Sequence, residues 1–120
     1  KKILVLKKNK SQKLNYSINE INFIKEIEKN SVLFFIIGAD NLVHFHKWKN
    51  YKTILKKCVI IVMHRPGYKI KALQSKLAKQ HKKLKINLTQ LKENNYTENK
   101  WIYLNIKGIN LSSSMIRNSL

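Results

Sequence analysis

The sequence predicts an α/β domain built on a parallel sheet, and two kinds of observation carry that prediction. Residues 32–37 and 58–63 are runs of six apolar residues without alternation, which is typical of strands covered on both faces. Stretches with helical spacing separate the apolar runs, and strands that alternate with helices favour parallel pairing. With 120 residues and 43% hydrophobic content, the chain is expected to form one domain with its own core.

The first half of the chain contains three predicted elements. Residues 3–6 form an apolar run between lysines and predict a short strand. Between residues 17 and 29, isoleucine recurs at spacings of three, which predicts a helix. Ser17 is the expected N-cap of this helix, and Glu20 completes a capping box. The strand at 32–37 follows and ends at Gly38-Ala39-Asp40.

The second half continues the alternation of helices and strands. A helical stripe over residues 42–55 precedes the strand at 58–63, which ends at His64-Arg65-Pro66-Gly67. Residues 70–84 are predicted to be helical, residues 85–99 to be a loop, and residues 101–106 to be the last strand. Three consecutive serines at 112–114 are expected to open a final helix.

The charge of the chain raises the expectation of a polyanionic partner. Lys+Arg 25 against Asp+Glu 6 give a net charge of +19. However, 23 of these cations are Lys and only 2 are Arg, and Lys, Asn and Ile share A/T-rich codons. A surface selected for phosphate is expected to use more Arg, because the guanidinium binds phosphate through two parallel hydrogen bonds. The charge alone therefore does not identify a partner.

Several function classes are disfavoured by composition. Cys58 is the one cysteine, so no disulfide framework is expected and a reducing cytoplasm is the predicted location. Apolar runs of six residues are too short to cross a membrane. The four histidines lack the spacing of a zinc site, and no metal ligands are predicted. Six acidic residues leave little scope for acid–base chemistry by paired carboxylates.

The candidate binding residues follow predicted strands, where α/β sheets bind ligands. The serines at 112–114, with Arg117 one turn later, suit a phosphate group, or they are a simple cap and a surface arginine. Asp40 can accept hydrogen bonds from ribose hydroxyls or cap a helix. Trp48 can stack on a flat ring or belong to the core.

Four blocks of the sequence, taken in order, resemble the bacterial nicotinate-nucleotide adenylyltransferases. The blocks are FIIGADNL at 35–42, FHKW at 45–48, IIVMHRPGY at 60–68 and LSSSMIR at 111–117. The last block is similar to the I-S-S-T-x-I-R signature of that family, with Leu111 in place of Ile and Ser114 in place of Thr. The resemblance covers nearly the whole chain and is weakest at 71–99.

This resemblance implies a Rossmann-like nucleotidyltransferase fold, with helices on both faces of a parallel sheet. It also implies transfer of AMP from ATP to nicotinate mononucleotide, with Mg²⁺, to give deamido-NAD and pyrophosphate. Catalysis would then rest on positioning and charge neutralisation. The residues implied on the nicotinate-nucleotide side are Ser17, Gly38, Asp40, Trp48 and Arg65, and those on the ATP side are Ser112, Ser113, Ser114 and Arg117.

The chain departs from the family pattern in two respects. No segment of Lys1–Leu120 matches the G-x-F-x-P-x-H-x-G-H motif, which follows the first strand of the family. Residues 1–120 are therefore expected to be a single, partial nucleotidyltransferase domain without catalytic residues and inactive alone. In addition, Glu20 stands where the family has a threonine beside the nicotinate carboxylate, which an ionised Glu20 would repel unless it turns outward.

Two other functions remain open from the sequence. A basic nucleic-acid-binding module would explain the charge of +19, although the lysines are scattered and no aromatic residues interleave with the cluster at 76–85. A decayed copy of the enzyme would keep the fold without the chemistry. The enzyme resemblance is favoured over both, a nucleic-acid partner is not expected, and nothing in the sequence specifies an oligomeric state.

Overall fold

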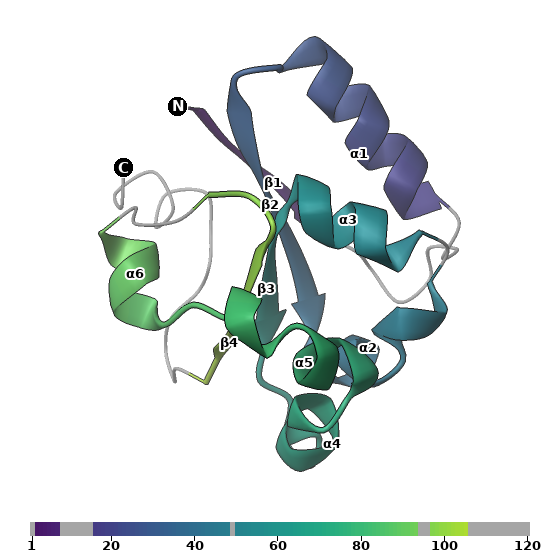
Figure 1. The fold of residues 1–120 in the computed structure, drawn as a ribbon, viewed down its shortest axis with the longest axis vertical. Coiled ribbons are helices and arrows are strands. Elements are labelled where there is room, and N and C mark those ends of the chain that lie inside the picture. Colours follow the sequence, from purple (N-terminus) through teal and green to yellow (C-terminus); the bar gives the residue numbers. More distant parts are fainter. Residues whose placement is uncertain (1, 8–15, 49, 94–96, 106–120) are drawn as a thin grey trace.

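A computed structural model describes residues 2–7, 16–48, 50–93 and 97–105 of the chain (Figure 1). It contains a four-stranded sheet formed by β1 (Lys2–Lys7), β2 (Ser31–Gly38), β3 (Val59–Met63) and β4 (Lys100–Leu104). The strand order is β1-β2-β3-β4, and each neighbouring pair is parallel. The predicted parallel sheet is confirmed.

The register of the strands aligns the carboxyl ends of β2, β3 and β4. Gly38 of β2 pairs with Met63 of β3, and Met63 pairs with Leu104 of β4. Each of these residues is the last of its strand, so three strands end on the same rung. This end lies at the bottom of Figure 1, where the helices α2 (Ala39–Val43), α4 (Lys69–Leu73) and α5 (Lys76–Gln80) are found.

One face of the sheet carries the larger core. Alternate residues of β2 (Leu33, Phe35 and Ile37) point into it together with Ile60 and Val62 of β3. Helices α1 (Tyr16–Ile27), α2 and α3 (Tyr51–Lys57), the short 3₁₀ helix η1 (Phe45–Lys47) and α5 cover these side chains. The continuous apolar run of β2 thus divides its side chains between two cores, as strands buried on both faces do.

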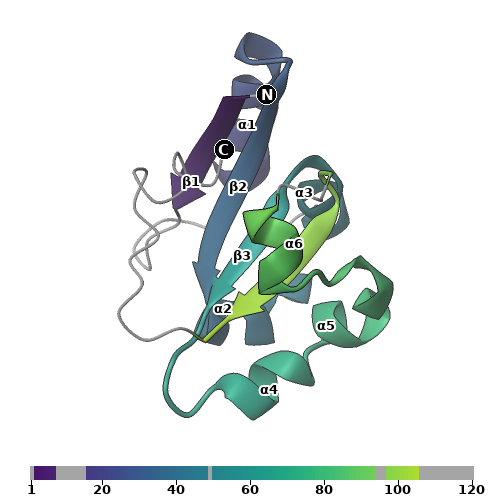
Figure 2. The ribbon, with the colours of Figure 1, turned by 90° about the vertical axis from the view of Figure 1, so that its left-hand side faces the viewer.

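The opposite face carries a smaller core. It contains the other residues of β2 (Val32, Phe34 and Ile36), with Leu91 from α6 (Leu88–Lys92) packed against them. In Figure 2, α6 lies on the side of the sheet away from α1 and α3. The prediction of helices on both faces is therefore confirmed. Among the described residues, no helix has the length and apolar character that crossing a lipid bilayer requires.

Two predictions for residues 70–99 are wrong. The expected helix at 70–84 is instead α4, α5 and the 3₁₀ helix η2 (Lys82–Leu84). The break falls at Ser75, whose hydroxyl accepts a hydrogen bond from the Ala78 N–H and caps α5. The expected loop at 85–99 contains α6, which begins with a reciprocal capping box between Asn87 and Gln90.

The bounds of two other elements differ from prediction. Helix α1 already includes Tyr16, so Ser17 lies within the helix and is not its N-cap. The same helix ends at Ile27, two residues before the expected end. Strand β4 ends at Leu104, which pairs with Met63 of β3. Asn105, which the sequence predicts to belong to this strand, lies outside it. The helix expected from Ser112 lies outside the described residues.

The amino end of the sheet is closed by polar contacts between α1, β2 and the segment before β4. Lys25 of α1 donates to the Ser31 carbonyl at 3.3 Å and forms an ion pair with Glu98. The Ser31 hydroxyl donates to the Glu28 carbonyl at 2.6 Å. Asn99 has a left-handed backbone (φ 70°), and its N–H donates to the Cys58 carbonyl at 2.9 Å.

Candidate active site at the carboxyl end of the sheet

The carboxyl end of the sheet brings together an acidic and a basic residue that follow different strands. Asp40 lies in the first turn of α2, directly after β2, and Arg65 lies two residues after β3. The Arg65 Nε and the Asp40 Oδ1 are 3.7 Å apart. This distance is longer than a normal hydrogen bond, so the two groups form a loose ion pair. The sequence predicted that both residues belong to one site, and the register of β2 and β3 brings them together.

The two partners of this ion pair differ in exposure. The Arg65 side chain is 52% exposed, whereas the Asp40 side chain is 21% exposed. A guanidinium has five N–H donors, so Arg65 can contact Asp40 and still offer donors to an anion. A carboxylate is an acceptor that can bind the hydroxyls of a sugar. The Arg65 guanidinium is therefore open to solvent, and the adjacent Asp40 carboxylate is more buried.

Gly38 makes room for the ion pair. A Cβ atom at position 38 would lie 2.4 Å from the Asp40 Oδ1 and 2.9 Å from the Arg65 Nε. Both distances are shorter than real Cβ contacts, so any larger residue would push the two side chains away. The backbone of Gly38 is extended (φ −84°, ψ 160°), which any residue can adopt. Space for Asp40 and Arg65, rather than backbone freedom, explains the glycine.

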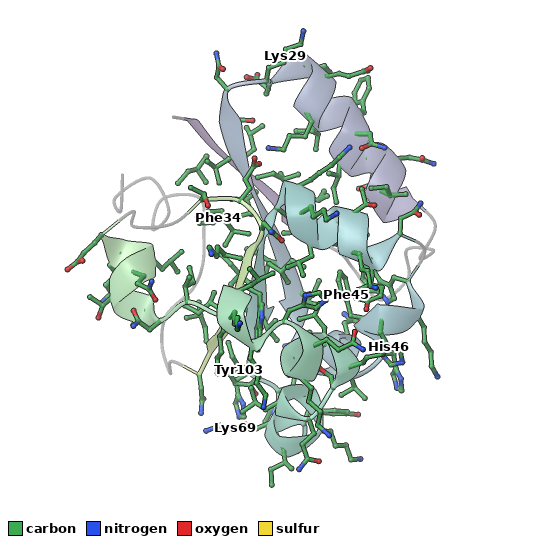
Figure 3. All side chains as sticks on the ribbon, viewed as in Figure 1. Lys29, Phe34, Phe45, His46, Lys69 and Tyr103 are labelled. Carbon is green, nitrogen blue, oxygen red and sulfur yellow. The ribbon has the colours of Figure 1, made fainter. Side chains whose placement is uncertain are left out.

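A second polar pair links the ends of β3 and β4. The His64 N–H donates to the Leu104 carbonyl at 2.9 Å, and a hydrogen bond of 2.7 Å joins His64 Nδ1 to the Tyr103 hydroxyl. The two rings are 5.9 Å apart in an edge-on arrangement. Burial raises the pKa of Tyr103 above its usual value. Tyr103 lies near the lower end of the sheet in Figure 3.

Sequence reasoning missed the pair of His64 and Tyr103. The sequence places His64 after a predicted strand and gives it no partner, and it places Tyr103 within another predicted strand. The signal that was present is the position of each residue: His64 directly follows one apolar strand, and Tyr103 is the second-last residue of another. The pairing itself depends on the register of β3 and β4, which sequence patterns do not specify.

Trp48 lies in the core of the structure. The residue is only 5% exposed, and its ring centroid is 4.7 Å from that of Phe45 and 6.0 Å from that of Phe35. Phe45 occupies the space between η1 and the sheet (Figure 3). Stacking of Trp48 on a substrate ring stays a prediction, and it would require one face of the indole to be uncovered.

The remaining predicted site residues are described in part or not at all. Ser17 lies in the first turn of α1. Ser112, Ser113, Ser114 and Arg117 lie outside the described residues, so their roles stay predictions. Within the described ranges, no group of three or more His, Cys, Asp or Glu side chains could hold a metal ion. Cys58 is buried, and burial raises the pKa of its thiol to about 12.

Comparison with known proteins identifies relatives that match most of the chain. The chain is 37% identical over 103 residues to a protein of Pelagibacter ubique named "Probable nicotinate-nucleotide adenylyltransferase", covering 86% of this chain and 48% of that protein. Proteins of the same name from Clostridium acetobutylicum and Clostridium novyi are 32% and 30% identical over 116 and 111 residues. Each of these matches covers 92% of this chain and 49% of the relative. The chain thus spans about half the length of the curated relatives that it matches.

A sequence model of a nucleotidyltransferase family agrees with these relatives. The cytidylyltransferase-like model matches residues 2–119. The parallel sheet and the position of Asp40 and Arg65 after its strands are consistent with the fold expected from that match. Because the match extends over nearly all of the sequence, we conclude that the chain belongs to the cytidylyltransferase-like family.

Proposed function

We propose that this chain forms the part of a nicotinate-nucleotide adenylyltransferase that binds the mononucleotide and contributes to ATP binding. The whole enzyme would transfer AMP from ATP to nicotinate mononucleotide, releasing pyrophosphate and forming deamido-NAD. The names of the three relatives support this reaction. Because the reaction consumes ATP and forms a precursor of NAD, we place it in the cytoplasm.

The observation that carries the proposal is the Asp40–Arg65 ion pair, which lies next to Gly38. A mononucleotide carries a phosphate and two ribose hydroxyls, which match the exposed guanidinium and the adjacent carboxylate in chemical type. Gly38 permits the close approach of both groups, and a ligand at this end of the sheet would also approach the backbone of Gly38 closely. Arg65 would neutralise phosphate charge, and Asp40 would orient the ribose.

The chemistry proposed for this site is positioning and charge neutralisation. Phosphoryl-type transfers need the two reactants aligned and their negative charge offset, and they need no covalent enzyme intermediate. Mg²⁺ bound to ATP would supply part of that neutralisation. The described residues contain no group of three or more His, Cys, Asp or Glu side chains that could hold the ion, and we expect phosphate oxygens and water to hold it, as Mg²⁺ favours.

The nicotinate end of the ligand is assigned to Trp48 and Ser17. Trp48 would stack on the ring after one face of the indole is uncovered, and Ser17 would supply a hydroxyl for the nicotinate carboxylate. Glu20 lies on the same helix as Ser17 and would have to point away from that carboxylate. Nicotinate and nicotinamide mononucleotides differ in this one group, so their relative affinities test this part of the proposal.

Calorimetry on the 120-residue chain tests the proposed function. Nicotinate mononucleotide and Mg²⁺–ATP should each bind, and nicotinate mononucleotide should bind more tightly than nicotinamide mononucleotide. We expect pyrophosphate release from the two substrates to stay near the uncatalysed rate, because no histidine of the chain lies in a His-x-Gly-His context. A chain that binds neither nucleotide would contradict the proposal. Turnover at a normal enzymatic rate would contradict only the expected inactivity.

One observation favours a second candidate, a polyanion-binding function. Residues 41–92 contain 13 Lys and one Arg but no Asp or Glu. Cations without intervening carboxylates attract phosphate backbones of any sequence. Titration with duplex DNA at two salt concentrations distinguishes the candidates: tight binding that weakens steeply with salt, together with no mononucleotide binding, would favour the second function.

A further inference from the structure

His64 is held in place at two points. Its backbone N–H donates to the Leu104 carbonyl, which extends the pairing of β3 and β4 by one residue beyond the last rung. Its ring is held by the hydrogen bond between Nδ1 and the Tyr103 hydroxyl. A half-buried side chain with both restraints has a defined orientation, which is the property expected of a residue that contacts a ligand.

His64 and Arg65 reach from the end of β3 toward opposite neighbours. Arg65 contacts Asp40, which follows β2, whereas His64 contacts Tyr103 on β4. The two consecutive residues thus place a guanidinium and an imidazole along the same carboxyl end of the sheet, where nucleotides bind in α/β folds. Among the described residues, the hydrogen bond of the His64 ring uses Nδ1, and no bond to the second ring nitrogen, Nε2, is formed.

We propose that His64 is a second phosphate-binding residue of this site and that Tyr103 is its positioning residue. The proposal rests on the proposed function, since the phosphate would belong to the mononucleotide or to ATP. His64 would donate from Nε2 to a phosphate oxygen, beside the charge that Arg65 supplies. Tyr103 would act only through His64, by fixing the ring and its tautomer.

The Tyr103 hydroxyl is compatible with the tautomer that this role requires. A hydroxyl can donate to Nδ1 or accept from it, and the proposed role uses the arrangement in which the Tyr103 hydroxyl donates. A neutral histidine that accepts at Nδ1 carries its own proton at Nε2, so Nε2 is a donor. Phosphate oxygens are acceptors, so an imidazole with its proton at Nε2 can donate to one of them.

Calorimetry with nicotinate mononucleotide and with nicotinate riboside, which lacks the phosphate, tests the proposal on the full chain. His64→Leu should weaken mononucleotide binding about tenfold and leave riboside binding unchanged. His64→Gln supplies an amide donor near the position of Nε2 and should restore most of the lost affinity. Tyr103→Phe keeps the ring packing and should cost about threefold. The same variants with Mg²⁺–ATP show which substrate supplies the phosphate.

Matched control variants change the same residue types elsewhere. His44→Leu alters an exposed histidine at the end of α2, and Tyr51→Phe removes a hydroxyl that donates to Gln80 at 3.3 Å. Neither should alter the affinity for the mononucleotide. Thermal unfolding of every variant identifies any that fail to fold, and Tyr103→Phe still tests the proposal if His64→Leu is unstable.

The outcomes separate this proposal from the proposed function. If the mononucleotide binds and His64→Leu, His64→Gln and Tyr103→Phe all behave like the controls, the role of His64 is wrong and the function stands. If neither nucleotide binds, the function is wrong, and proton NMR of the histidine rings with inorganic pyrophosphate decides the role of His64. A shift of the His64 resonances that exceeds the shift of His44 would support that role, and equal or absent shifts would overturn it.

Discussion

Lys25 and Arg65 are both paired cations, but they lie at opposite ends of the sheet. At the amino end, Lys25 contacts the Ser31 carbonyl and Glu98, and its side chain is 18% exposed. At the carboxyl end, Arg65 forms a loose ion pair with Asp40, and its side chain is 52% exposed. The first cation is held between elements that must stay together, whereas the second can exchange its partner for a ligand.

This difference implies that the two ends affect different measurements. Groups that connect α1, β2 and β4 should affect the free energy of unfolding without changing ligand affinity. Exposed charged side chains at the carboxyl end should affect affinity with little change in stability, because exposed ion pairs contribute little to folding. Four predictions, ordered from the largest expected effect to the smallest, test this separation.

The largest effect is expected at Cys58, near the amino end. Burial raises the pKa of its thiol to about 12 from 9.0, so the folded protein should contain about a thousandfold less thiolate than an exposed cysteine at about pH 8. Alkylation by iodoacetamide should be correspondingly slow in buffer and fast in urea. The folded state favours the neutral thiol, so this group should stabilise the fold below pH 9.0 and stabilise it less as the pH rises toward 12. Equal rates in buffer and urea would contradict burial.

The second prediction concerns Arg65 at the carboxyl end. Arg65→Ala should weaken binding of nicotinate mononucleotide about thirtyfold, because a charge-assisted contact with phosphate is lost. The midpoint of thermal unfolding should stay unchanged, since the side chain is half exposed. Arg65→Lys keeps the charge without the planar donors and should recover part of the affinity. A marked loss of stability would show that Arg65 also supports the fold.

The third prediction tests whether Gly38 acts through Asp40. Gly38→Ala should weaken mononucleotide binding about tenfold and lower stability by about 1 kcal/mol, because the added methyl group displaces the Asp40 carboxylate. In an Asp40→Ala background the nearest contact is gone, so the same substitution should have a smaller effect. Urea denaturation measures the stability of the variants, and calorimetry measures their affinity for the mononucleotide. Additive effects in the double variant would contradict a shared cause.

The smallest effect is expected for Glu98 at the amino end. Glu98→Gln removes its charge from the ion pair with Lys25 and should lower the free energy of unfolding by about 0.5–1 kcal/mol. Because Glu98 and Arg65 lie at opposite ends of the sheet, the affinity for the mononucleotide should not change. Urea denaturation and calorimetry on one preparation test both parts. A change in affinity would show that the two ends are coupled.

Much of the sheet could be predicted from the sequence, because strands buried on both faces leave a plain signal. The runs at 32–37 and 58–63 have no room for polar residues, since alternate side chains enter two different cores. The many polar residues at 85–99 predict a loop, although the segment contains α6. Its helix depends on the Asn87–Gln90 capping box, a local pattern that overall polarity conceals.

Part of the candidate site could also be predicted, because its residues follow the strands of a parallel sheet. Parallel strands bring their carboxyl ends together, so the proximity of Asp40 and Arg65 follows from the order of elements. The bond between His64 and Tyr103 depends on which residues of β3 and β4 are paired. Trp48 illustrates a third limit, because an aromatic residue on a helical stripe has the same sequence pattern in a core and in a binding site.

The common last rung of β2, β3 and β4 makes the chemistry of this end sensitive to chain length. Side chains alternate between the two faces of a sheet, so deleting one residue from β3 would turn His64 and Arg65 toward the faces opposite to their present ones. The imidazole would then no longer face Tyr103, and the guanidinium would no longer face Asp40. Such a deletion would retain every proposed binding residue and still separate each from its partner. For relatives of this chain, the spacing between strand ends is therefore as informative as the identity of the residues that follow them.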